Sequence, residues 1–279
     1  MDQSSDCIVC GSRSAKLIFF KDDYPIVKCQ SCGLVFVEPE SFPKGASSEL
    51  YDEKYFEGGI YSDYLGEREY RLSLFERKLP LVEAQVLKGG KLLDVGCAAG
   101  YFLEVAASKG YDVFGVEVSK YATDHVDESL RPRVFTGVLE DARFPIDFFD
   151  AITMWDVLEH LPNPLDALRE AHRVLQKGGK LIVETVNVSC INAKLLGPRW
   201  PLYRPPFHLF YFSVSTLTEL LRKSGFEVAK VEPMQTYSPF HRHKTIRYFD
   251  MMRRYHENSF IMKIVKRLFA DVVLIMAET

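Results

Sequence analysis

The chain has 279 residues, of which 47% are hydrophobic and 26% are charged, and its formal net charge is −3. This composition is typical of a globular protein with one main domain and a small appendage. The sequence contains no apolar run of about 18 residues that could form a transmembrane helix, and residues 1–6 are too polar to begin a signal peptide. We therefore expect a cytoplasmic protein without a transmembrane segment.

Four cysteines near the N-terminus form two copies of the pattern C-x-x-C-G: Cys7, Cys10, Cys29 and Cys32. Each such turn brings two sulfur atoms to one metal ion, and the following glycine lets backbone N–H groups approach the thiolates. The spacing predicts a four-thiolate Zn²⁺ site, which is structural because it has no open coordination position. Disulfides or redox pairs are the weaker interpretation, since a cytosolic protein keeps its thiols reduced. We assign residues 1–40 to a zinc-ribbon-like domain and interpret Cys97 and Cys190 as ordinary buried thiols.

Residues 41–80 are predicted to form a linker and lid helices. A turn-rich stretch at 40–48 is followed by six aromatic residues: Tyr51, Tyr55, Phe56, Tyr61, Tyr64 and Tyr70. Two interpretations stay open, because such residues either pack a helix onto the main domain or cover a bound cofactor and substrate. Tyr61 and Tyr64 are the best lid candidates, since Gly58 and Gly59 provide a hinge before them.

The most informative motif is D-V-G-C-A-A-G at residues 94–100, between an apolar strand at 91–93 and a helix that begins at Tyr101. Gly96 suits a sharp backbone turn, and Gly100 allows the helix to pack close to a ligand. Glu117 ends the next predicted strand, where a carboxylate can accept hydrogen bonds from both hydroxyls of a ribose. The spacing differs from the G-x-G-x-x-G of dinucleotide sites.

With these residues, the stretch from 91 to about 232 resembles the class I S-adenosylmethionine-dependent methyltransferases. In many relatives, an aspartate that binds the adenine ring follows the glycine that corresponds to Gly137. This chain has Val138 and Leu139 there. We therefore expect backbone groups near Leu139, with Glu140 or Asp141, to bind the adenine. The cofactor-binding residues that we expect are Asp94, Gly96, Gly100, Glu117, Leu139, Trp155 and Tyr64.

Strands and helices alternate over the rest of the chain, which predicts an α/β fold with a doubly wound, Rossmann-like sheet. Helices are expected at 164–175, ended by Gly178 and Gly179, and at 215–223, ended by Gly225. The resemblance implies seven strands, the last one antiparallel between the fifth and the sixth, and assigns residues 81–279 to the methyltransferase domain. The expected strands after the first lie at 111–118, 133–135, 150–155, 180–185, 226–231 and 271–276.

The loops that follow the fourth and fifth strands are expected to carry the chemistry, because ligands bind at the carboxyl ends of parallel strands. In the first loop, Asp156, Glu159 and His160 match positions that bind a divalent cation in the ubiquinone-pathway O-methyltransferases, which this segment resembles. Relatives without a metal use the Glu-His pair to hold the loop by hydrogen bonds. We favour the metal-free interpretation, because three ligands within five residues need a special local turn.

In the second loop, His208 lies in an apolar stretch at 203–213 and is our candidate general base. Histidine has a reference pKa near neutrality, which suits removal of a proton from a hydroxyl, so the rate should show an ionisation near neutral pH. The alternative is that His208 only packs or caps the loop.

A cysteine pair of this kind, a tyrosine-rich connector and a histidine after the fifth strand also resemble the deoxysugar C-methyltransferases. In those enzymes a glutamate and a tyrosine precede the histidine, whereas this chain has Phe207 and Pro205 at these places. The shorter zinc-ribbon methyltransferases of glycan and natural-product pathways are more similar in length. The resemblance implies O- or C-methylation of a small acceptor, a sugar or a glycan or natural-product intermediate, with S-adenosylmethionine as cofactor and Zn²⁺ as a structural ion.

Two other classes are weighed against this function. A zinc-ribbon RNA methyltransferase needs a basic surface, but the chain has 38 acidic and 35 basic residues, so nucleic acid is not an expected partner. A non-enzymatic zinc-ribbon interaction protein is disfavoured by the intact motif at 94–100. The basic cluster at 242–267 suggests an amphipathic helix, most simply a solvated face, with peripheral membrane contact as an alternative.

Overall fold

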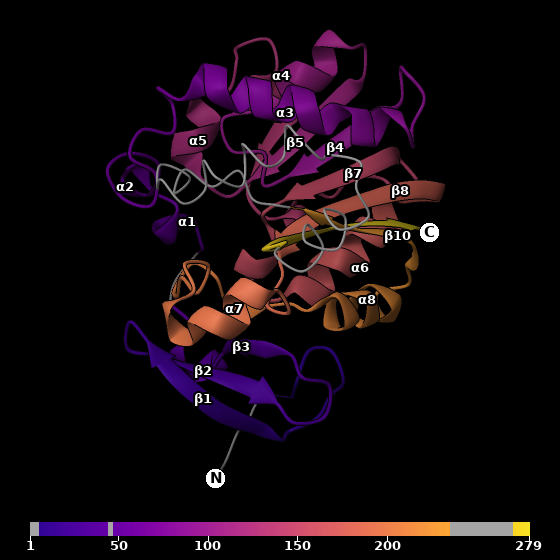
Figure 1. Cartoon of the computed structure of the whole chain (residues 1–279). Coiled ribbons are helices and arrows are strands. Elements are labelled where there is room, and N and C mark those ends of the chain that lie inside the picture. The colour runs from indigo at the N-terminus through magenta and orange to yellow at the C-terminus, as the bar shows by residue number, and fades with distance from the viewer. Residues whose placement is uncertain (1–5, 44–46, 235–269) are drawn as a thin grey trace, which may run out of the picture.

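The computed structural model describes residues 6–43, 47–234 and 270–279. Within these ranges the chain forms a seven-stranded sheet flanked by helices and a smaller four-stranded sheet at the opposite end of the molecule from α3 and α4 (Figure 1). The basic cluster predicted at 242–267 lies outside the described residues.

The larger sheet has the strand order β10-β11-β8-β7-β4-β5-β6 in the described part of the chain. Parallel pairing joins β6, β5, β4, β7 and β8, whereas β11 runs antiparallel between β8 and β10. This confirms the predicted seven-stranded sheet and the place of its last strand. The strands are β4 Lys91–Val95, β5 Asp112–Glu117, β6 Val134–Thr136, β7 Phe149–Trp155, β8 Leu175–Val186, β10 Glu227–Met234 and β11 Val272–Glu278.

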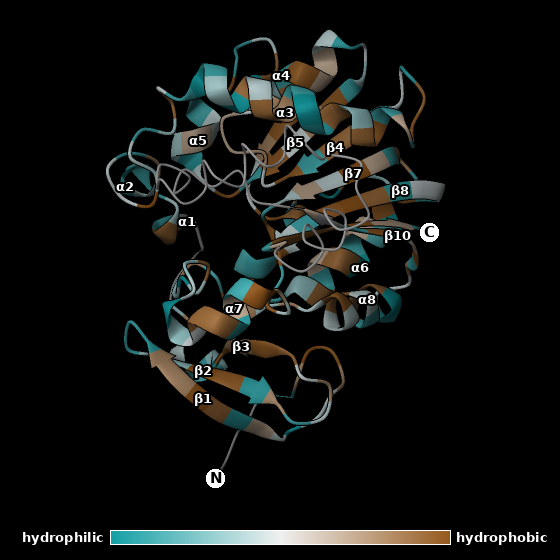
Figure 2. Cartoon of the chain, viewed as in Figure 1, coloured by the Kyte–Doolittle hydropathy of each residue, from teal (hydrophilic) through white to brown (hydrophobic). Residues whose placement is uncertain are grey.

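Helices cover both faces of this sheet (Figure 1). α3 and α4 lie on one face and α6 and α8 on the other, and hydrophobic residues concentrate in the strands between them (Figure 2). α6 illustrates the local cause: Asn163 caps its N-terminus, and Ala167, Leu168, Ala171 and Val174 form one buried stripe. The α-helices are α1 Ser47–Leu50, α2 Glu53–Phe56, α3 Arg68–Glu83, α4 Tyr101–Ser108, α5 Lys120–Asp124, α6 Pro164–Val174, α7 Ile191–Leu196 and α8 Val214–Lys223. The short 3₁₀ helices are η1 Pro39–Ser41, η2 Arg131–Arg133, η3 Leu139–Asp141, η4 Leu158–His160 and η5 Gly197–Arg199.

The expectation that Gly178 and Gly179 end a helix is wrong. α6 ends at Val174, and Leu175, already extended, begins the twelve-residue strand β8, so both glycines lie inside that strand. A Cβ atom at Gly179 would lie 2.7 Å from the carbonyl oxygen of Gln176, so close backbone packing is what requires glycine there.

The smaller sheet has the order β1-β2-β3-β9 and is antiparallel throughout. Three strands come from the N-terminal segment, but β9 comes from the loop after β8, more than 170 residues further along the chain. The assignment of residues 1–40 to a separate domain stays a prediction. The strands are β1 Ala15–Lys21, β2 Tyr24–Cys29, β3 Val35–Val37 and β9 Phe210–Tyr211.

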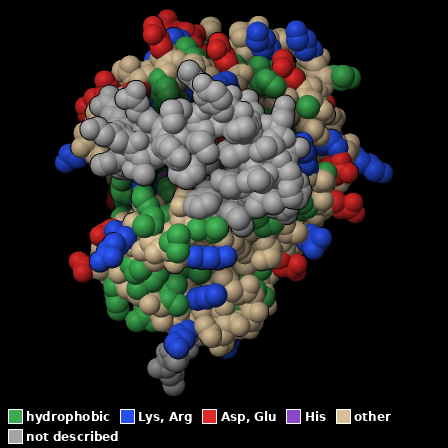
Figure 3. Space-filling view, viewed as in Figure 1, with side chains coloured by type: hydrophobic (Ala, Val, Ile, Leu, Met, Phe, Trp, Pro, Cys, Tyr) green, Lys and Arg blue, Asp and Glu red, His purple; other side chains and the backbone are tan. Residues whose placement is uncertain are grey.

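The described surface carries charges of both signs. On the face in Figure 3, Lys and Arg side chains lie beside hydrophobic ones over the lower half, around α7 and the smaller sheet, and the visible Asp and Glu side chains lie mostly around the rim. None of the helices in the described ranges is long and apolar enough to cross a membrane.

Candidate functional site

The turn between β4 and α4 forms the floor of the site. Gly96 has φ +73°, its N–H donates to the carbonyl of Val116 at 2.7 Å, and a Cβ atom there would lie 2.5 Å from Cγ2 of Val157. Gly100 is the left-handed N-cap of α4 and faces Val126. Glycine is therefore required at both positions by backbone conformation and close packing, although Gly100, unlike Gly96, does not line the adjoining cavity.

Glu117, at the end of β5, is buried with both carboxylate oxygens engaged. One accepts the N–H of Ser119 at 2.8 Å and the other accepts the N–H of Ala98 at 2.9 Å. Burial raises the pKa of Glu117, and these hydrogen bonds oppose that effect. Each oxygen keeps a second lone pair, so the fixed carboxylate can still accept a hydroxyl donor.

Asp94 and Lys78 are two further buried ionisable residues at the floor of the site. Asp94 accepts a hydrogen bond from Oγ1 of Thr153 at 2.6 Å, and burial raises its pKa to about 7. Nζ of Lys78 lies 2.9 Å from Glu184 and 4.8 Å from the ring centroid of Trp155. Our sequence analysis missed Lys78 and Glu184; the signal for Glu184 was a charged residue inside an otherwise apolar strand.

These residues surround a cavity of about 390 Å³, which is within the usual range for ligand sites. A wall of contacting aromatic rings from the segment before α3 closes one side; Tyr55 and Tyr61, for example, lie 5.5 Å apart between centroids. Nε1 of Trp155 is buried and has no hydrogen-bond partner among the described residues, as expected where a polar ligand supplies the missing bond. The predicted cofactor residues that line this cavity are Tyr64, Asp94, Gly96, Glu117, Leu139 and Trp155.

A second, smaller cavity of about 140 Å³ adjoins the first. It lies toward the loop after β8 and is lined by His208, which does not reach the larger cavity. The two cavities share one wall, made of Tyr55, Tyr61, Arg71, Leu74, Asp156 and His160.

Two residues stabilise the aromatic wall in ways that the sequence did not reveal. Arg71 was not selected from the sequence, and Tyr51 was selected only as an aromatic residue, not for a hydrogen bond. The guanidinium of Arg71 lies 3.7 Å from the ring centroid of Tyr64 and 4.7 Å from that of Tyr61. Tyr64 also stacks on Tyr101 of α4, with centroids 5.7 Å apart. The aromatic segment therefore packs against the main domain and lines the cavity at the same time.

His208 and His160 lie together although they come from different loops. Their ring centroids are 4.7 Å apart, and the hydroxyl of Tyr51 lies 3.0 Å from Nδ1 of His160. Glu159, His160 and His208 each bring a potential ligand atom within 4.8 Å of the others. One oxygen of Glu159 accepts a hydrogen bond from Oγ1 of Thr185 at 2.6 Å, and the other is buried with no hydrogen-bond partner in the part of the chain that the structure describes. The two loops that the sequence analysis treated separately form one cluster.

Burial sets the protonation of this cluster. It lowers the pKa of His160 to about 4 and that of His208 well below its usual value, so both rings are neutral at physiological pH. This direction differs from the ionisation near neutrality expected from the sequence, because the residue His208 is only 7% exposed. The same burial, with the nearby charge of Asp156, raises the pKa of Glu159 to about 8.

Asp156 differs from the residues of this cluster. It has a left-handed backbone, with φ +54°, and its N–H donates to the carbonyl of Glu184 at 2.9 Å. Burial, followed by the charge of Glu184, raises its pKa to about 7. Among the described residues, the group with metal-ligand spacing contains His208 in place of Asp156.

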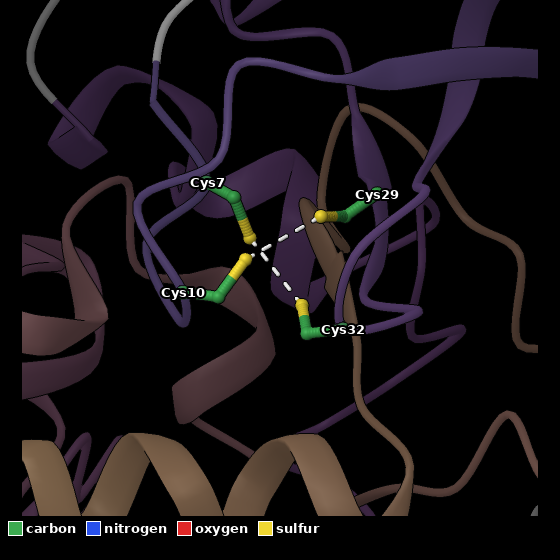
Figure 4. A group of neighbouring side chains, drawn as sticks. All are labelled: Cys7, Cys10, Cys29 and Cys32. Atoms are coloured by element: carbon green, nitrogen blue, oxygen red, sulfur yellow. Dashed lines mark hydrogen bonds between the residues drawn. The ribbon is translucent and has the colours of Figure 1, made fainter.

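The four N-terminal cysteines point to one common centre (Figure 4). The sulfur atoms of Cys7 and Cys32 are 3.6 Å apart, as are those of Cys10 and Cys29, and none of the four forms a disulfide. Tetrahedral Zn–S bonds of about 2.3 Å would place sulfur atoms about 3.8 Å apart. The four sulfur atoms therefore fit a metal ion that is bound by four thiolates.

Residues 64–231 match a family model described as "Methyltransferase domain". A ubiquinone biosynthesis O-methyltransferase of Pseudomonas aeruginosa (strain UCBPP-PA14) is 29% identical over 171 residues, which are 56% of this chain and 72% of that protein. A "Probable S-adenosylmethionine-dependent methyltransferase" of Mycolicibacterium smegmatis is 32% identical over 142 residues, which cover 50% of this chain and 53% of that protein.

Solved structures share the fold at low sequence identity. A SAM-dependent methyltransferase from Archaeoglobus fulgidus superposes with a TM-score of 0.56 and 17% identity, covering 77% of this chain and 99% of that one. The [4+2]-cyclase SpnF superposes with a TM-score of 0.51 and 24% identity, covering 73% and 81%. Because one of these proteins is named as a cyclase, the fold alone does not fix the reaction.

Proposed function

The chain belongs to the S-adenosylmethionine-dependent methyltransferases, and from this premise we propose that it methylates an oxygen or carbon atom of a small acceptor, a sugar or a glycan or natural-product intermediate. The observation that carries the proposal is the pair of adjoining cavities with a shared wall. The larger cavity suits the cofactor, and the smaller one, with aromatic and charged side chains, suits the reacting part of a polar acceptor.

In this proposal Glu117 accepts hydrogen bonds from the ribose hydroxyls through its remaining lone pairs, because its carboxylate is already fixed by two backbone N–H groups. Asp94 and Gly96 border the amino-acid end of the cofactor, and Leu139 borders the adenine. Trp155 and Tyr64 close the cavity, while Gly100 acts through the turn that begins α4.

S-adenosylmethionine supplies an electrophilic methyl group, so the protein has to align the acceptor and remove its proton. We assign the proton removal to His208. Its Nδ1 lies 2.9 Å from the carbonyl oxygen of Leu202, to which it donates in the neutral ring. Nε2 then carries the free lone pair, and burial keeps it unprotonated.

A metal-assisted reaction is the second candidate, as in the ubiquinone-pathway interpretation of Asp156, Glu159 and His160. Two observations favour it: Glu159, His160 and His208 approach one another closely, and one oxygen of Glu159 has no hydrogen-bond partner within the described ranges. A bound cation would lower the pKa of an acceptor hydroxyl. Since His208 belongs to both candidate mechanisms, its substitution alone does not separate them.

A Glu159→Gln variant and mild chelation separate the two mechanisms. Under the base mechanism we expect turnover to survive a chelator that leaves the cysteine-bound metal in place, as checked by elemental analysis. Loss of turnover on chelation, restored by Mg²⁺ in the wild type but not in Glu159→Gln, would transfer the chemistry to the metal.

The function itself is tested by titration calorimetry with S-adenosylmethionine and by transfer of its labelled methyl group to a panel of nucleotide sugars and glycan precursors. We expect saturable cofactor binding and labelling of at least one acceptor class. Binding with labelling of RNA but of no small molecule would contradict the proposed substrate class, and absent binding would contradict the cofactor assignment.

We also propose that the four cysteines hold one structural Zn²⁺, with no part in the chemistry. The support is the sulfur spacing and the absence of disulfides among these four residues.

A further inference from the structure

The strand β9 ties the loop after β8 to the smaller sheet. Phe210 pairs with Phe36 and Tyr211 with Val35 in antiparallel register. The N–H of Val37 also donates to the carbonyl of Leu209 at 2.8 Å. The residue that follows His208 is thus held by the last residue of β3.

Leu209 is held from its other side as well. Its N–H donates to the carbonyl of Glu159 at 2.8 Å, so one residue bridges β3 and the 3₁₀ helix η4, which carries His160. The hydroxyl of Tyr211 donates to the carbonyl of His208 at 2.8 Å. These hydrogen bonds fix the backbone of His208 and therefore restrict the position of its imidazole ring.

Side chains reinforce this connection. The ring of Phe36 stacks on that of Phe210 with centroids 6.3 Å apart, and Phe210 stacks on Phe212 at 6.0 Å. Leu209 and these rings share one buried cluster with Cys7 and Cys29. The apolar contacts therefore run without a break from the cysteine turns to the segment after His208.

The cysteine turns are rigidly connected to β3. The second turn leads into that strand through Leu34, which is fully buried and whose carbonyl accepts the N–H of Cys29 at 2.8 Å. The first turn is held by Lys223 of α8, whose Nζ donates to the carbonyl of Ile8 at 2.8 Å. Closure of the four thiolates on one ion fixes the start of β3 relative to α8.

We propose that the four-cysteine unit positions the acceptor side of the site: through β3 it holds Leu209 and thereby fixes the imidazole of His208 beside that of His160. Its importance for turnover rests on the proposed function of His208. The larger cavity meets this connection only at the shared wall, because its lining includes His160 but no described residue of β1, β2, β3 or β9. Loss of the ion or of β3 packing disorders the acceptor side and leaves cofactor binding intact.

The experiment uses the full chain, with Phe36→Ala as the test variant and Phe36→Leu as its conservative partner. Phe20→Ala is the matched control, since Phe20 lies on the edge strand β1 and is 62% exposed. Amide hydrogen exchange is followed at Val37 and Leu209, with Gly96 as the reference. Modification by diethyl pyrocarbonate is mapped at His208, with the exposed His125 as the reference.

In Phe36→Ala we expect exchange at Leu209 and carbethoxylation of His208 to rise by about tenfold, with S-adenosylmethionine affinity and metal content unchanged. Phe36→Leu should restore most of the protection, and Phe20→Ala should match the wild type. Unchanged protection, or faster exchange at Gly96 with weaker cofactor binding, would overturn the proposal.

Removal of the ion from the wild type, followed by reloading with Zn²⁺, decides the question if Phe36→Ala does not fold. Protection of Val37 and Leu209 should disappear and return, and its persistence in metal-free protein would refute the positioning role. A His208→Ala variant with full turnover would overturn the base role but leave these exchange results valid.

Discussion

The two cavities of the site are built in different ways. The floor of the larger cavity comes from consecutive βα units, where Asp94, Gly96 and Glu117 lie within 24 residues of one another along the chain. The smaller cavity depends on contacts between distant segments, since Leu209, which follows His208, is joined by backbone hydrogen bonds to both Glu159 and Val37. Local sequence therefore determines the floor of the larger cavity, our proposed cofactor side, and long-range assembly determines the smaller cavity, our proposed acceptor side.

This difference predicts that substitutions can impair one cavity without impairing the other. A change in the cysteine unit or the loop after β8 should affect the acceptor side, whereas a change at the end of β5 should affect cofactor affinity. The shared wall, which contains Asp156 and His160, is where the two effects meet.

The largest effect is expected from Cys29→Ser, which removes one of four thiolates. Structural zinc sites contribute on the order of 10 kcal/mol of binding free energy, so the variant should lose its ion and the order of the smaller sheet. Elemental analysis should find about one Zn²⁺ per wild-type chain and none in the variant. Cys190→Ser is the control, and iron or no metal in reduced wild type would contradict the zinc site.

His208→Ala should lower turnover by roughly 10²–10⁴ while leaving S-adenosylmethionine affinity unchanged, because a positioned base contributes about that much. His125→Ala, at an exposed histidine, should retain wild-type turnover. Because burial lowers the pKa of His208, the loss of rate from its protonation should lie at acid pH. A neutral-pH ionisation that disappears only in His208→Ala would contradict the buried, neutral ring.

The sequence predicted the larger sheet well because each element carried its own signal. Apolar strands, the glycine turn at 94–100 and the apolar spacing of the helix expected at 164–175, observed at Pro164–Val174, are all local patterns. The pairing of Phe36 with Phe210 could not be predicted, because two-residue strands have no distinctive periodicity and their pairing depends on the whole fold. The contact of His160 with His208 and the lowered pKa of both rings follow from that same pairing and burial.

Glu117→Ala tests the cofactor side. It removes the proposed charge-assisted contact with the ribose and should weaken S-adenosylmethionine binding by about 1.5–3 kcal/mol with the fold intact. Calorimetry measures the affinity, and Glu128→Ala, at an exposed position, serves as the control. Protection of Leu209 against exchange should not change in Glu117→Ala, so unchanged affinity or a disordered acceptor side would each contradict the division between the two cavities.

Asp156→Asn probes the shared wall by its effect on stability. Burial raises the folded-state pKa of Asp156 from 3.8 to about 7, so between these values the folded protein holds a proton that the unfolded chain releases. The free energy of unfolding of the wild type therefore decreases as pH rises through this window. Asparagine carries no charge, so the cofactor-free variant should gain about 2–3 kcal/mol relative to the wild type between pH 5 and pH 8.

Urea unfolding at both pH values measures this gain, with Asp166→Asn, at an exposed residue of α6, as the control. The charge of Asp156 also helps to raise the pKa of Glu159, so that pKa should fall in the variant, as carboxyl NMR shifts can follow. An equal effect of Asp156→Asn at both pH values would mean that the wild-type carboxylate is ionised throughout. The shared wall would then present a fixed negative charge to both cavities at every working pH, balanced by the charges of Lys78 and Arg204.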